Sequence, residues 1–561
     1  MDDDPVAFPI LDAAALAVLE GLGTRQPTAT GEYLYREGDA TYDFFVVLSG
    51  AVEIVAHRQG EEEVVARHDA GRFLGELNML TGQRVYVSAR VVEAGEVLVV
   101  PTAALRHVLA ATPGLGDTIL AAFIARRAVL LSGGTAAARV IGSQFSPESL
   151  RLREFLARNR IPHEWIDADR DPAVDTLLQD VGVTAADLPV VIAPGTVMRR
   201  PTPGELAAYL GLTIESIPDR CFDLVVVGGG PAGLAAAVYG ASEGLRTLVV
   251  ETVAVGGQAG TTSRIENYLG FPTGISGNDL AQRAVIQAEK FGAQLTSPCE
   301  AQSLREEAGH LVIRLADGTD VAGRAVIVAS GARYRRLGVP RLADFEGNGV
   351  YYAATEMEAR LCAASPVVVA GGGNSAGQAA LFLAAADSPV TVVIRGRDLD
   401  ASMSRYLVDR IEEHPGIEVR TETHITGLDG DRSLSAVRVT TADGDEVLSC
   451  AALFSFIGAE PTAGWLTGCA ALDERGFVLT DRSLGAEHLD ERWTSLGRGP
   501  LPFETSHPGL FAVGDVRSGS TKRVAAAVGE GSASVQSVHE HLAFAHPADV
   551  TASPEKEKVT T

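Results

Sequence analysis

Three glycines about two-fifths of the way along the chain are spaced as in a loop that binds phosphates. Gly228, Gly230 and Gly233 follow a run of apolar residues and open an Ala-rich stretch, with Pro231 and Ala232 between them. In such a loop the first glycine permits a tight turn, the second admits a pyrophosphate close to the backbone, and the third lets helix and strand pack closely. The N–H groups at the start of the helix favour bound anions. The sequence therefore predicts a dinucleotide-binding turn between a strand and a helix.

An acidic residue follows at the place where the ribose of an adenine dinucleotide would lie. Glu251 ends the next predicted strand, 18 residues after Gly233, and an acid at this position accepts hydrogen bonds from ribose hydroxyls. The alternative is a glycine-rich turn that binds no ligand. A strand, a helix and an acid in the required order favour the dinucleotide.

A second loop of the same kind lies further along the chain. Gly371, Gly373 and Ala376 stand between another apolar run and another Ala-rich stretch, and Asn374 and Ser375 complete the loop. Two such units favour a protein that binds two dinucleotides over a solenoid, whose repeats are shorter.

The second loop differs from the first in the residues that follow its next predicted strand. Arg395 and Arg397 stand there, and no acid is present to bind a ribose 2′-hydroxyl. Arginine at this position suits a 2′-phosphate, so the sequence predicts NADPH rather than NADH. The alternative is that both arginines are only solvated surface residues.

A third element near the C-terminus supports a flavin. Gly514 and Asp515 follow a short apolar run and precede a turn and a predicted helix. An aspartate here can hold a ribityl chain, and the helix N-terminus can face the flavin ring. Because this element is far from the first loop, we expect an FAD unit that is split by an inserted NADP unit.

With these motifs in place, residues 221–545 resemble the low-molecular-weight thioredoxin reductases. The stretch GGQAGTTSRIENYLGFP at 256–272, both glycine loops, and FAVGDV followed by KRVAAAVGEG match that family. The resemblance implies a homodimeric FAD protein whose nicotinamide domain rotates between two states. It also implies FAD contacts beyond the first loop, from Gly257, Gln258, Asn267, Gly514, Asp515, Lys522, Arg523 and Val524.

One departure from the family pattern concerns the redox centre. The family places a CxxC motif just before the second glycine loop, and the two positions fall here on Ala353 and Glu356. Alanine cannot form a thiolate or a mixed disulfide. Cys362 lies nearby but alone, and is expected to be a buried residue without a redox role. We therefore predict no catalytic residue of the dithiol type and an unidentified acceptor: an external disulfide, a quinone, a one-electron carrier protein or oxygen.

Residues 145–217 resemble a glutaredoxin- or thioredoxin-like domain. Pro189 in DLPVV matches the cis-proline of that family, but Ser146 and Ser149 stand where its thiols would be. A structural or partner-docking role is expected for this degenerate domain.

Residues 30–131 resemble a cyclic-nucleotide-binding β-roll. Glu76 matches the acid that binds the ribose, but Val87 stands where an arginine should neutralise the cyclic phosphate. Arg84 and Arg90 flank this position, but their spacing from it does not suit the place of that arginine on a strand or turn. Burying a phosphate without a cationic partner is costly, so binding of cAMP or cGMP is doubtful, and a dimer contact or a docking face is the alternative role.

Composition limits the partners. The 561 residues predict about three to five domains, and 72 acidic against 47 basic residues give a formal net charge of -25. This charge argues against nucleic acid or an anionic membrane as the main partner. The sequence has no run of about 18 apolar residues and no basic n-region at its start, so a cytoplasmic protein is expected.

Together these features predict a multidomain fold: an N-terminal β-roll with a helix, a small thioredoxin-like α/β domain, and two Rossmann-like three-layer α/β domains. The expected segments are the β-roll at 1–140, the thioredoxin-like domain at 145–217, the FAD domain at 221–337 and 461–545, the inserted NADP domain at 338–460, and a flexible tail at 546–561. Residues 132–144 are small and polar with a glycine pair, and are expected to form a linker between the first two segments. The predicted function is that of an NADPH-dependent flavin oxidoreductase. The alternative is a redox- or NADPH-sensing regulatory flavoprotein that signals to a partner through its N-terminal domain.

Overall fold

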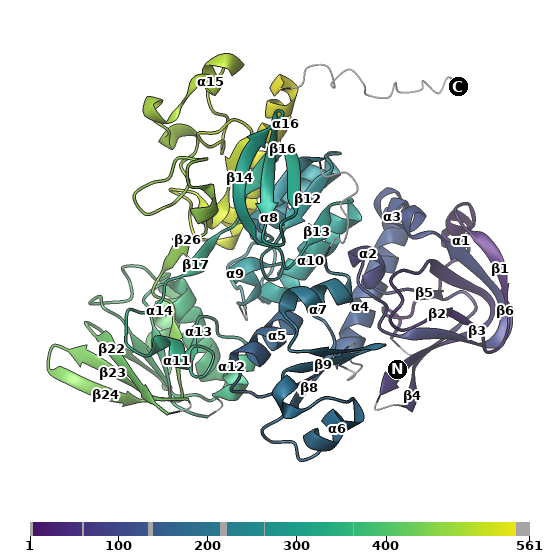
Figure 1. Cartoon of the computed structure of the whole chain (residues 1–561), viewed down its shortest axis with the longest axis horizontal. Coiled ribbons are helices and arrows are strands. Elements are labelled where there is room, and N and C mark those ends of the chain that lie inside the picture. The colour runs from purple at the N-terminus through teal and green to yellow at the C-terminus, as the bar shows by residue number, and fades with distance from the viewer. Residues whose placement is uncertain are drawn as a thin grey trace. The chain divides into compact units, whose positions relative to one another are not determined.

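The computed structural model describes residues 4–58, 61–132, 138–213, 221–262, 264–362, 364–431 and 433–545 (Figure 1). The expected tail at 546–561 and part of the expected linker, residues 133–137, lie outside them. Two compact units are present. One comprises residues 1–218, 241–254 and 285–299, and the other comprises residues 219–240, 255–284 and 300–561.

The N-terminal part of the first unit is a β-roll. Its six strands form an antiparallel sheet in the order β1-β6-β3-β4, with β2 paired to β6 and β5 paired to β3. Its elements are α1 (Ala13–Glu20), β1 (Thr24–Thr28), β2 (Tyr33–Tyr35), β3 (Phe44–Arg58), β4 (Glu61–Asp69), β5 (Phe73–Leu74), α2 (Asn78–Thr81), β6 (Ser88–Val100), α3 (Thr102–Ala111) and α4 (Pro113–Ser132).

The roll closes because its long strands are rich in β-branched and aromatic residues, which suit a half-buried pleated surface. Phe44, Phe73 and Phe123 are fully buried, and their rings lie 5.2–6.4 Å apart between centroids. Phe123 comes from α4, so this helix packs against the inner face of the roll. The same core cluster includes Ile286 of a helix much further along the chain.

A second, four-stranded sheet follows in the order β10-β9-β7-β8. Strand β7 is parallel to β8 and antiparallel to β9. Its elements are β7 (Ala138–Gly142), α5 (Pro147–Arg158), β8 (His163–Asp167), α6 (Val174–Asp180), η1 (Ala185–Asp187), β9 (Val190–Ala193), β10 (Thr196–Arg199) and α7 (Pro203–Leu210).

One expectation about this region was wrong. Residues 138–142 were expected in a linker, but they form β7, an inner strand of the sheet. The short segment Ala-Arg-Val-Ile-Gly has only three large apolar or amphipathic side chains between small residues, so it carries little strand signal by itself. Its burial comes from neighbours supplied later in the chain, and Val140 and Ile141 are both fully buried.

The first glycine loop follows β11, a strand of a seven-stranded mixed sheet. The strand order is β13-β12-β11-β16-β15-β14, and β27 pairs with β16. Strands β11, β16 and β27 are parallel, whereas β14, β15 and β16 are joined antiparallel. The strands are β11 (Cys221–Val227), β12 (Thr247–Val250), β13 (Gln294–Thr296), β14 (Ala301–Glu307), β15 (His310–Leu315), β16 (Asp320–Val328) and β27 (Leu510–Ala512).

The helices of this part of the chain come from two stretches, one before and one after the inserted segment. They are α8 (Pro231–Ser242), α9 (Gly257–Gly260), α10 (Gly277–Lys290), η2 (Gly464–Leu466), η3 (Asp481–Ser483), η4 (Ala486–His488), α15 (Glu491–Leu496), η5 (Gly514–Val516) and α16 (Val524–Ala545).

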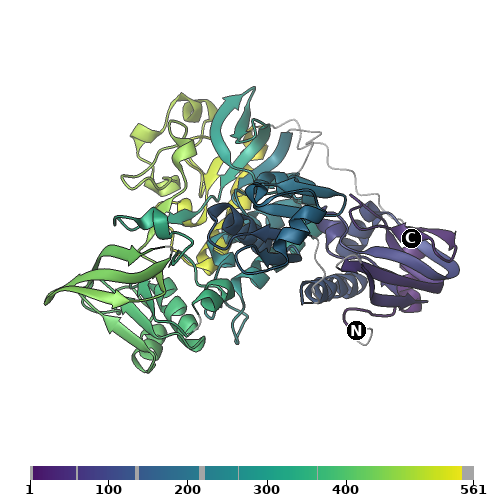
Figure 2. The ribbon, with the colours of Figure 1, turned by 60° about the horizontal axis from the view of Figure 1, so that its bottom comes forward.

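The inserted segment forms a five-stranded parallel sheet in the order β18-β25-β19-β20-β21. Strands β22–β24 form a separate three-stranded layer, visible as green arrows (Figures 1 and 2). The two-stranded ribbon β17–β26 joins the ends of the insertion. The elements are β17 (Ala332–Tyr334), α11 (Leu342–Phe345), β18 (Val350–Tyr351), α12 (Glu356–Leu361), β19 (Val367–Ala370), α13 (Asn374–Ala385), β20 (Val390–Val393), α14 (Arg405–Glu412), β21 (Ile417–Arg420), β22 (His424–Gly430), β23 (Leu434–Thr441), β24 (Gly444–Ser449), β25 (Ala452–Ser455) and β26 (Ala459–Pro461).

Among the described residues, no single helix is long and apolar enough to cross a membrane. Only the pair of segments 102–109 and 113–130, which meet at a bend of 116°, reaches the necessary length and hydropathy when taken together. The described residues also contain no group of three or more His, Cys, Asp or Glu side chains that could hold a metal ion.

Candidate functional site

The first glycine loop joins β11 to α8 and leaves no room for side chains. Gly228 has a φ of +112°, and a Cβ added there would lie 2.3 Å from the carbonyl oxygen of Ala329. A Cβ on Gly233 would lie 1.8 Å from the carbonyl oxygen of Gly228. Both positions therefore accept only glycine, as the sequence predicts for a close helix–strand turn.

A second backbone segment lies against this loop. Gly257, at the start of α9, has a φ of +54°, and a Cβ on it would lie 3.0 Å from the Cα of Gly230. The side-chain amide of Gln258 donates a hydrogen bond to the carbonyl oxygen of Ala332. Gln258 thus ties α9 to the start of β17, and the two glycine segments stay in contact.

The C-terminal element completes this cradle. Gly514 has a φ of +70°, and its added Cβ would lie 2.9 Å from the Cβ of Ala232. Its backbone N–H donates to the Glu530 carboxylate at 2.7 Å, and the same carboxylate pairs with Arg517 at 2.7 Å. Glu530 was not among the predicted site residues. Its role depends on a hydrogen bond between α16 and Gly514, and no sequence motif indicates that contact.

The carboxyl of Asp515 lies beside the cradle in a partly buried place. Burial raises its pKa, while the nearby Lys522 ammonium acts in the opposite direction and Glu530 raises it further. The pKa of Lys522 is lowered, chiefly by burial. Lys522 donates a hydrogen bond to the backbone carbonyl of Asp515, so the two predicted residues are brought together.

Helix α16 approaches the first loop through one glycine. A Cβ on Gly531 would lie 2.0 Å from the carbonyl oxygen of Ala232. Residues from three distant stretches of the chain therefore surround one backbone-lined cradle: 228–233, 257–258 and 514–531. A pyrophosphate needs such close access to backbone N–H groups at a helix N-terminus, so the residues present fit the diphosphate of FAD.

The other predicted FAD contacts are less enclosed. Asn267 is exposed and Val524 is half-buried at the start of α16. Glu266, next to Asn267, pairs with Arg410 of α14 at 2.6 Å. Glu251 follows β12, and its carboxylate accepts the backbone N–H of Val253 at 3.0 Å.

The second glycine loop joins β19 to α13. Gly371 has a φ of +134°, and its added Cβ would lie 2.3 Å from the carbonyl oxygen of Phe456. Gly373 faces open space, as a position that admits a ligand must. Two serines missed by the sequence analysis hold the loop: Ser402 donates to the carbonyl of Gly372 at 2.8 Å, and the backbone N–H of Ser404 donates to the side chain of Asn374 at 2.7 Å.

The two predicted arginines follow β20, and both are exposed. Arg397 pairs with Glu422 at 3.4 Å and its side chain is 88% exposed. Within the part of the chain that the structure describes, Arg395 has no ion-pair partner. Arg395 is therefore the better placed of the two for a 2′-phosphate, because no carboxylate competes for it.

The segment that would hold a dithiol is occupied by other residues. Ala353 follows β18, and Thr355 directly precedes α12, with its backbone N–H donating to the Glu358 carboxylate at 2.9 Å. Burial raises the pKa of Cys362 to about 11. Burial and the charge of Cys362 raise the pKa of Cys450 to about 12. Both groups are protonated thiols at neutral pH, whereas the nucleophile in disulfide exchange is the thiolate.

The four-stranded α/β segment also offers no thiol at the start of its first helix. Ser146 is the N-cap of α5, and its hydroxyl accepts the backbone N–H of Ser149 at 3.3 Å. The Leu188–Pro189 peptide bond is cis, as the resemblance implies. Serine hydroxyls at these positions can cap a helix, but they cannot exchange disulfides.

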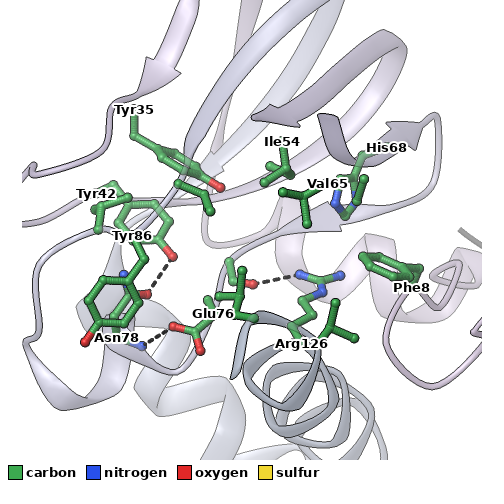
Figure 3. Close-up of a pocket in the computed structure, with 16 residues that line it drawn as sticks. Phe8, Tyr35, Tyr42, Ile54, Val65, His68, Glu76, Asn78, Tyr86 and Arg126 are labelled. Carbon is green, nitrogen blue, oxygen red and sulfur yellow. Dashed lines mark hydrogen bonds between the residues drawn. The ribbon is translucent and has the colours of Figure 1, made fainter. Parts of the chain in front are cut away.

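The β-roll encloses a cavity of about 40 Å³ that includes Glu76 and Val87 in its lining (Figure 3). The Glu76 carboxylate is already hydrogen-bonded within the chain. Both of its oxygens are bonded to Arg127 of α4, one of them at 2.7 Å, and one also accepts the backbone N–H of Asn78 at 3.1 Å. This ion pair is buried, with Arg127 and Glu76 only 3% and 5% exposed.

Neither of the flanking arginines turns toward the cavity. Arg84 donates to the backbone carbonyls of Tyr209 at 2.5 Å and Gly38 at 2.9 Å, and so fastens α7 to the roll. Arg90 pairs with Glu62 at 2.6 Å on the roll surface. The predicted lack of a phosphate-neutralising arginine in the Val87 region agrees with these contacts.

Known proteins resemble two parts of this chain. The family model described as pyridine nucleotide-disulphide oxidoreductase matches residues 222–531, and that of the cyclic nucleotide-binding domain matches residues 25–112. The thioredoxin reductase of Treponema pallidum (strain Nichols) is 35% identical over 312 residues, covering 55% of this chain and 94% of that protein. The "34.2 kDa protein in rubredoxin operon" of Clostridium pasteurianum is 30% identical over 316 residues, covering 56% and 94%.

Solved structures give the same result. The thioredoxin reductase of Lactococcus lactis, in its FR conformation, matches with a TM-score of 0.51 and 26% identity, over 57% of this chain and 99% of that one. The T. acidophilum enzyme matches with a TM-score of 0.51 and 27% identity, over the same shares. The resemblances of residues 221–545 and of the N-terminal roll are thereby confirmed, as is the predicted multidomain fold.

Proposed function

Because the chain belongs to the pyridine nucleotide-disulphide oxidoreductase family, we propose that it is an NADPH-dependent FAD enzyme that reduces an acceptor without an internal dithiol. That it is a flavin oxidoreductase follows from its relatives. One observation carries the finer proposal: both glycine cradles are intact, while Ala353 occupies a position where the family has a cysteine.

The chain's own residues would hold and orient the flavin cofactor. Gly230 and Gly257 keep the diphosphate region free of side chains. Asp515 and the start of α16 are proposed to hold the ribityl chain and the ring. Glu251 remains the acceptor for ribose hydroxyls predicted from the sequence. When bound, FAD supplies hydride acceptance from a nicotinamide and onward transfer of electrons.

The nicotinamide cofactor is proposed to be NADPH. Gly373 leaves the backbone open at the start of α13, and Arg395 offers an uncommitted guanidinium after β20. A guanidinium matches a phosphate with two parallel hydrogen bonds. Arg397, which is paired with Glu422, is proposed to contribute less.

The acceptor is proposed to lie outside the chain. An external disulfide, a quinone, a one-electron carrier protein and oxygen all remain compatible with a flavin that has no thiol partner. A homodimer is proposed from the resemblance of residues 221–545 to thioredoxin reductases.

A second candidate function is supported by one contact. Ile286 of α10, a helix of the flavoprotein segment, lies in the core cluster of the β-roll. A structural change in the roll would therefore alter the packing of α10. This favours a regulatory flavoprotein whose redox or NADPH state is reported to a partner through the N-terminal domain.

Steady-state turnover separates the two functions. The purified holoenzyme is mixed with NADPH or NADH and with thioredoxin disulfide, a low-molecular-weight disulfide, a quinone, a one-electron carrier or oxygen. An enzyme gives turnover with at least one acceptor well above the rate of free FAD, and a preference for NADPH. Turnover no faster than that of free FAD with every acceptor would favour the regulatory role.

A further inference from the structure

The cavity of the β-roll contains a second buried cation, which forms no ion pair with Glu76. Arg126 of α4 is 7% exposed, and it lines the cavity beside Gly75 and Leu130 (Figure 3). Burial lowers its pKa to about 10, so it is charged at neutral pH. Its neighbour Arg127 holds both carboxylate oxygens of Glu76.

Among the residues that the structure describes, Arg126 donates hydrogen bonds only to backbone carbonyls, and its guanidinium lies over the rings of Phe8 and Phe73. Its Nε donates to Ala7 at 2.7 Å, and its two terminal nitrogens donate to Gly75 at 2.8 Å and Phe73 at 3.1 Å. Within the described residues it has no ion-pair partner. Carbonyl groups have dipoles but no net charge, and two of the five N–H groups of a guanidinium remain beyond these three bonds.

Two further polar groups around the cavity lack partners in the described chain. His68 is 2% exposed, and its Nδ1 has no hydrogen bond. Burial and the charges of Arg126 and Arg72 hold the pKa of His68 well below its usual value, so the ring is neutral and can donate one N–H. The hydroxyl of Tyr35 points into the cavity (Figure 3).

The remaining lining is mostly apolar, although Tyr42, Asn78 and Tyr86 also belong to it. Ile54, Val65, Val87, Val129 and Leu130 face the same space. A cluster of convergent donors around one cation, set in apolar walls, is the usual construction of a small-molecule site. Here the donors suit an anion and the walls suit a hydrocarbon body.

We propose that this cavity binds a compact apolar carboxylate, with its anionic end on Arg126 and its hydrocarbon body between Ile54, Val87 and Leu130. Tyr35 and His68 would donate to the same carboxylate. This site differs from a cyclic-nucleotide site, because the Glu76 oxygens are already bonded and Val87 supplies no charge.

The size of the cavity sets the size of the ligand. A water molecule needs about 10–15 Å³ of such space, and the cavity offers about 40 Å³. Short-chain carboxylates match this room. Benzoate is larger and would also contact Phe8, which lines the cavity and lies beneath the Arg126 guanidinium.

Isothermal titration of the full-length holoenzyme with butyrate and benzoate tests the proposal. Butyramide and benzamide serve as neutral controls of the same shape. We expect the carboxylates to bind at least tenfold more tightly than the amides, because only the carboxylates neutralise Arg126. Equal affinity for acid and amide, or no binding of either carboxylate at millimolar concentration, would overturn the proposal.

Variants locate the site. Arg126→Gln removes the charge and is expected to weaken carboxylate binding at least tenfold. Because its carbonyl contacts could also be needed for folding, Ala66→Val provides an independent test by filling the cavity from β4, and is expected to abolish binding. Tyr35→Phe should weaken binding severalfold. Arg106→Met, on α3 outside the cavity, is the control and should leave binding unchanged.

Two outcomes would contradict the proposed carboxylate site. Undiminished butyrate binding in Ala66→Val would place the ligand elsewhere and refute the site. Binding of cAMP or cGMP at micromolar dissociation constants, with loss in Ala66→Val, would return the cavity to cyclic nucleotides. Flavin content and thermal unfolding of every variant show whether lost binding reflects lost folding.

Discussion

The two arginines after β20 differ in what surrounds them, and this difference predicts unequal roles. Replacing Arg395 by alanine should remove a charged hydrogen bond to the 2′-phosphate, an interaction of about 1.5–3 kcal/mol. We expect KM for NADPH to rise about 10- to 150-fold, with little change in KM for NADH. Initial rates with both nucleotides measure the effect.

Arg397→Ala is the matched control. Because Arg397 is exposed and paired with Glu422, we expect its loss to change KM for NADPH much less. If wild-type protein prefers NADH, or if both substitutions have equal effects, the assignment of Arg395 to a phosphate is wrong.

At the residue scale, the glycines were the best predicted part of the site. Gly228, Gly233 and Gly371 lie where any Cβ would collide with backbone carbonyls, and that requirement is visible in the sequence as spacing. The roles of Glu530 and Arg126 were not predicted. Their partners are carbonyls and N–H groups brought together by folding, and backbone groups leave no trace in side-chain spacing.

Helix α16 offers a test of the cradle at the scale of an element. Gly531→Ala should push α16 away from the carbonyl of Ala232, since the added Cβ would lie 2.0 Å from it. We expect the variant to lose most of its bound FAD on purification. The ratio of flavin absorbance to protein absorbance measures this.

Gly529→Ala is the control on the same helix. No atom lies within 4 Å of a Cβ added at Gly529, and alanine favours helix over glycine by about 1 kcal/mol. We expect full flavin content and unchanged or slightly higher stability. Equal flavin loss in both variants would show that helix propensity, rather than contact with Ala232, governs the result.

Helix α10 contributes a pH-dependent contact to the roll. Glu289 is 8% exposed, and one of its carboxylate oxygens has no hydrogen-bond partner among the described residues. Burial raises its pKa from 4.5 to about 8, and Arg106 and Arg127 act in the opposite direction. The folded chain therefore keeps this proton at pH values where the unfolded chain has released it.

Stability should fall as the pH rises. The contribution of Glu289 is fully present below pH 4.5 and is lost between pH 4.5 and about 8, at up to about 1.4 kcal/mol per pH unit. Glu289→Gln should remove this decline and be more stable than wild type at pH 8. Denaturant unfolding from pH 5 to pH 8 checks this.

Glu474→Gln provides the comparison for Glu289→Gln. Glu474 is an exposed carboxyl, so its replacement should leave the pH profile as in wild type. A wild-type profile in Glu289→Gln would mean that Glu289 is ionised in the folded protein at neutral pH.

At the element scale, periodicity predicted most strands and helices but not their partners. The two predicted units of strand, glycine loop and helix are present as β11 with α8 and β19 with α13. Strand β7 was missed because its own residues give little indication of a strand, and its burial comes from strands that follow later in the chain. The attachment of α7 to the roll by Arg84 was also missed, since Tyr209 lies 125 residues away in sequence.

For the whole molecule, intact nucleotide cradles occur without the thiols that distinguish a disulfide reductase. On the resemblances drawn from the sequence, we propose that Ala353 stands at a cysteine position of the family and that Ser146 and Ser149 stand at the thiol positions of the small α/β segment. The five cysteines are free in the structure. Cys362 and Cys450 are close enough for the charge of one to raise the pKa of the other, so this pair alone needs exclusion by experiment.

The most direct measurement is the number of electrons that each FAD-loaded subunit accepts in an anaerobic dithionite titration. We predict two, because the proposed function assigns no redox group other than FAD to the subunit. Cys450→Ser should give the same value, and Ala353→Cys combined with Glu356→Cys should raise it to four by restoring a dithiol. Four electrons in the wild-type protein, reduced to two in Cys450→Ser, would show that Cys362 and Cys450 form a redox pair and would contradict the central claim.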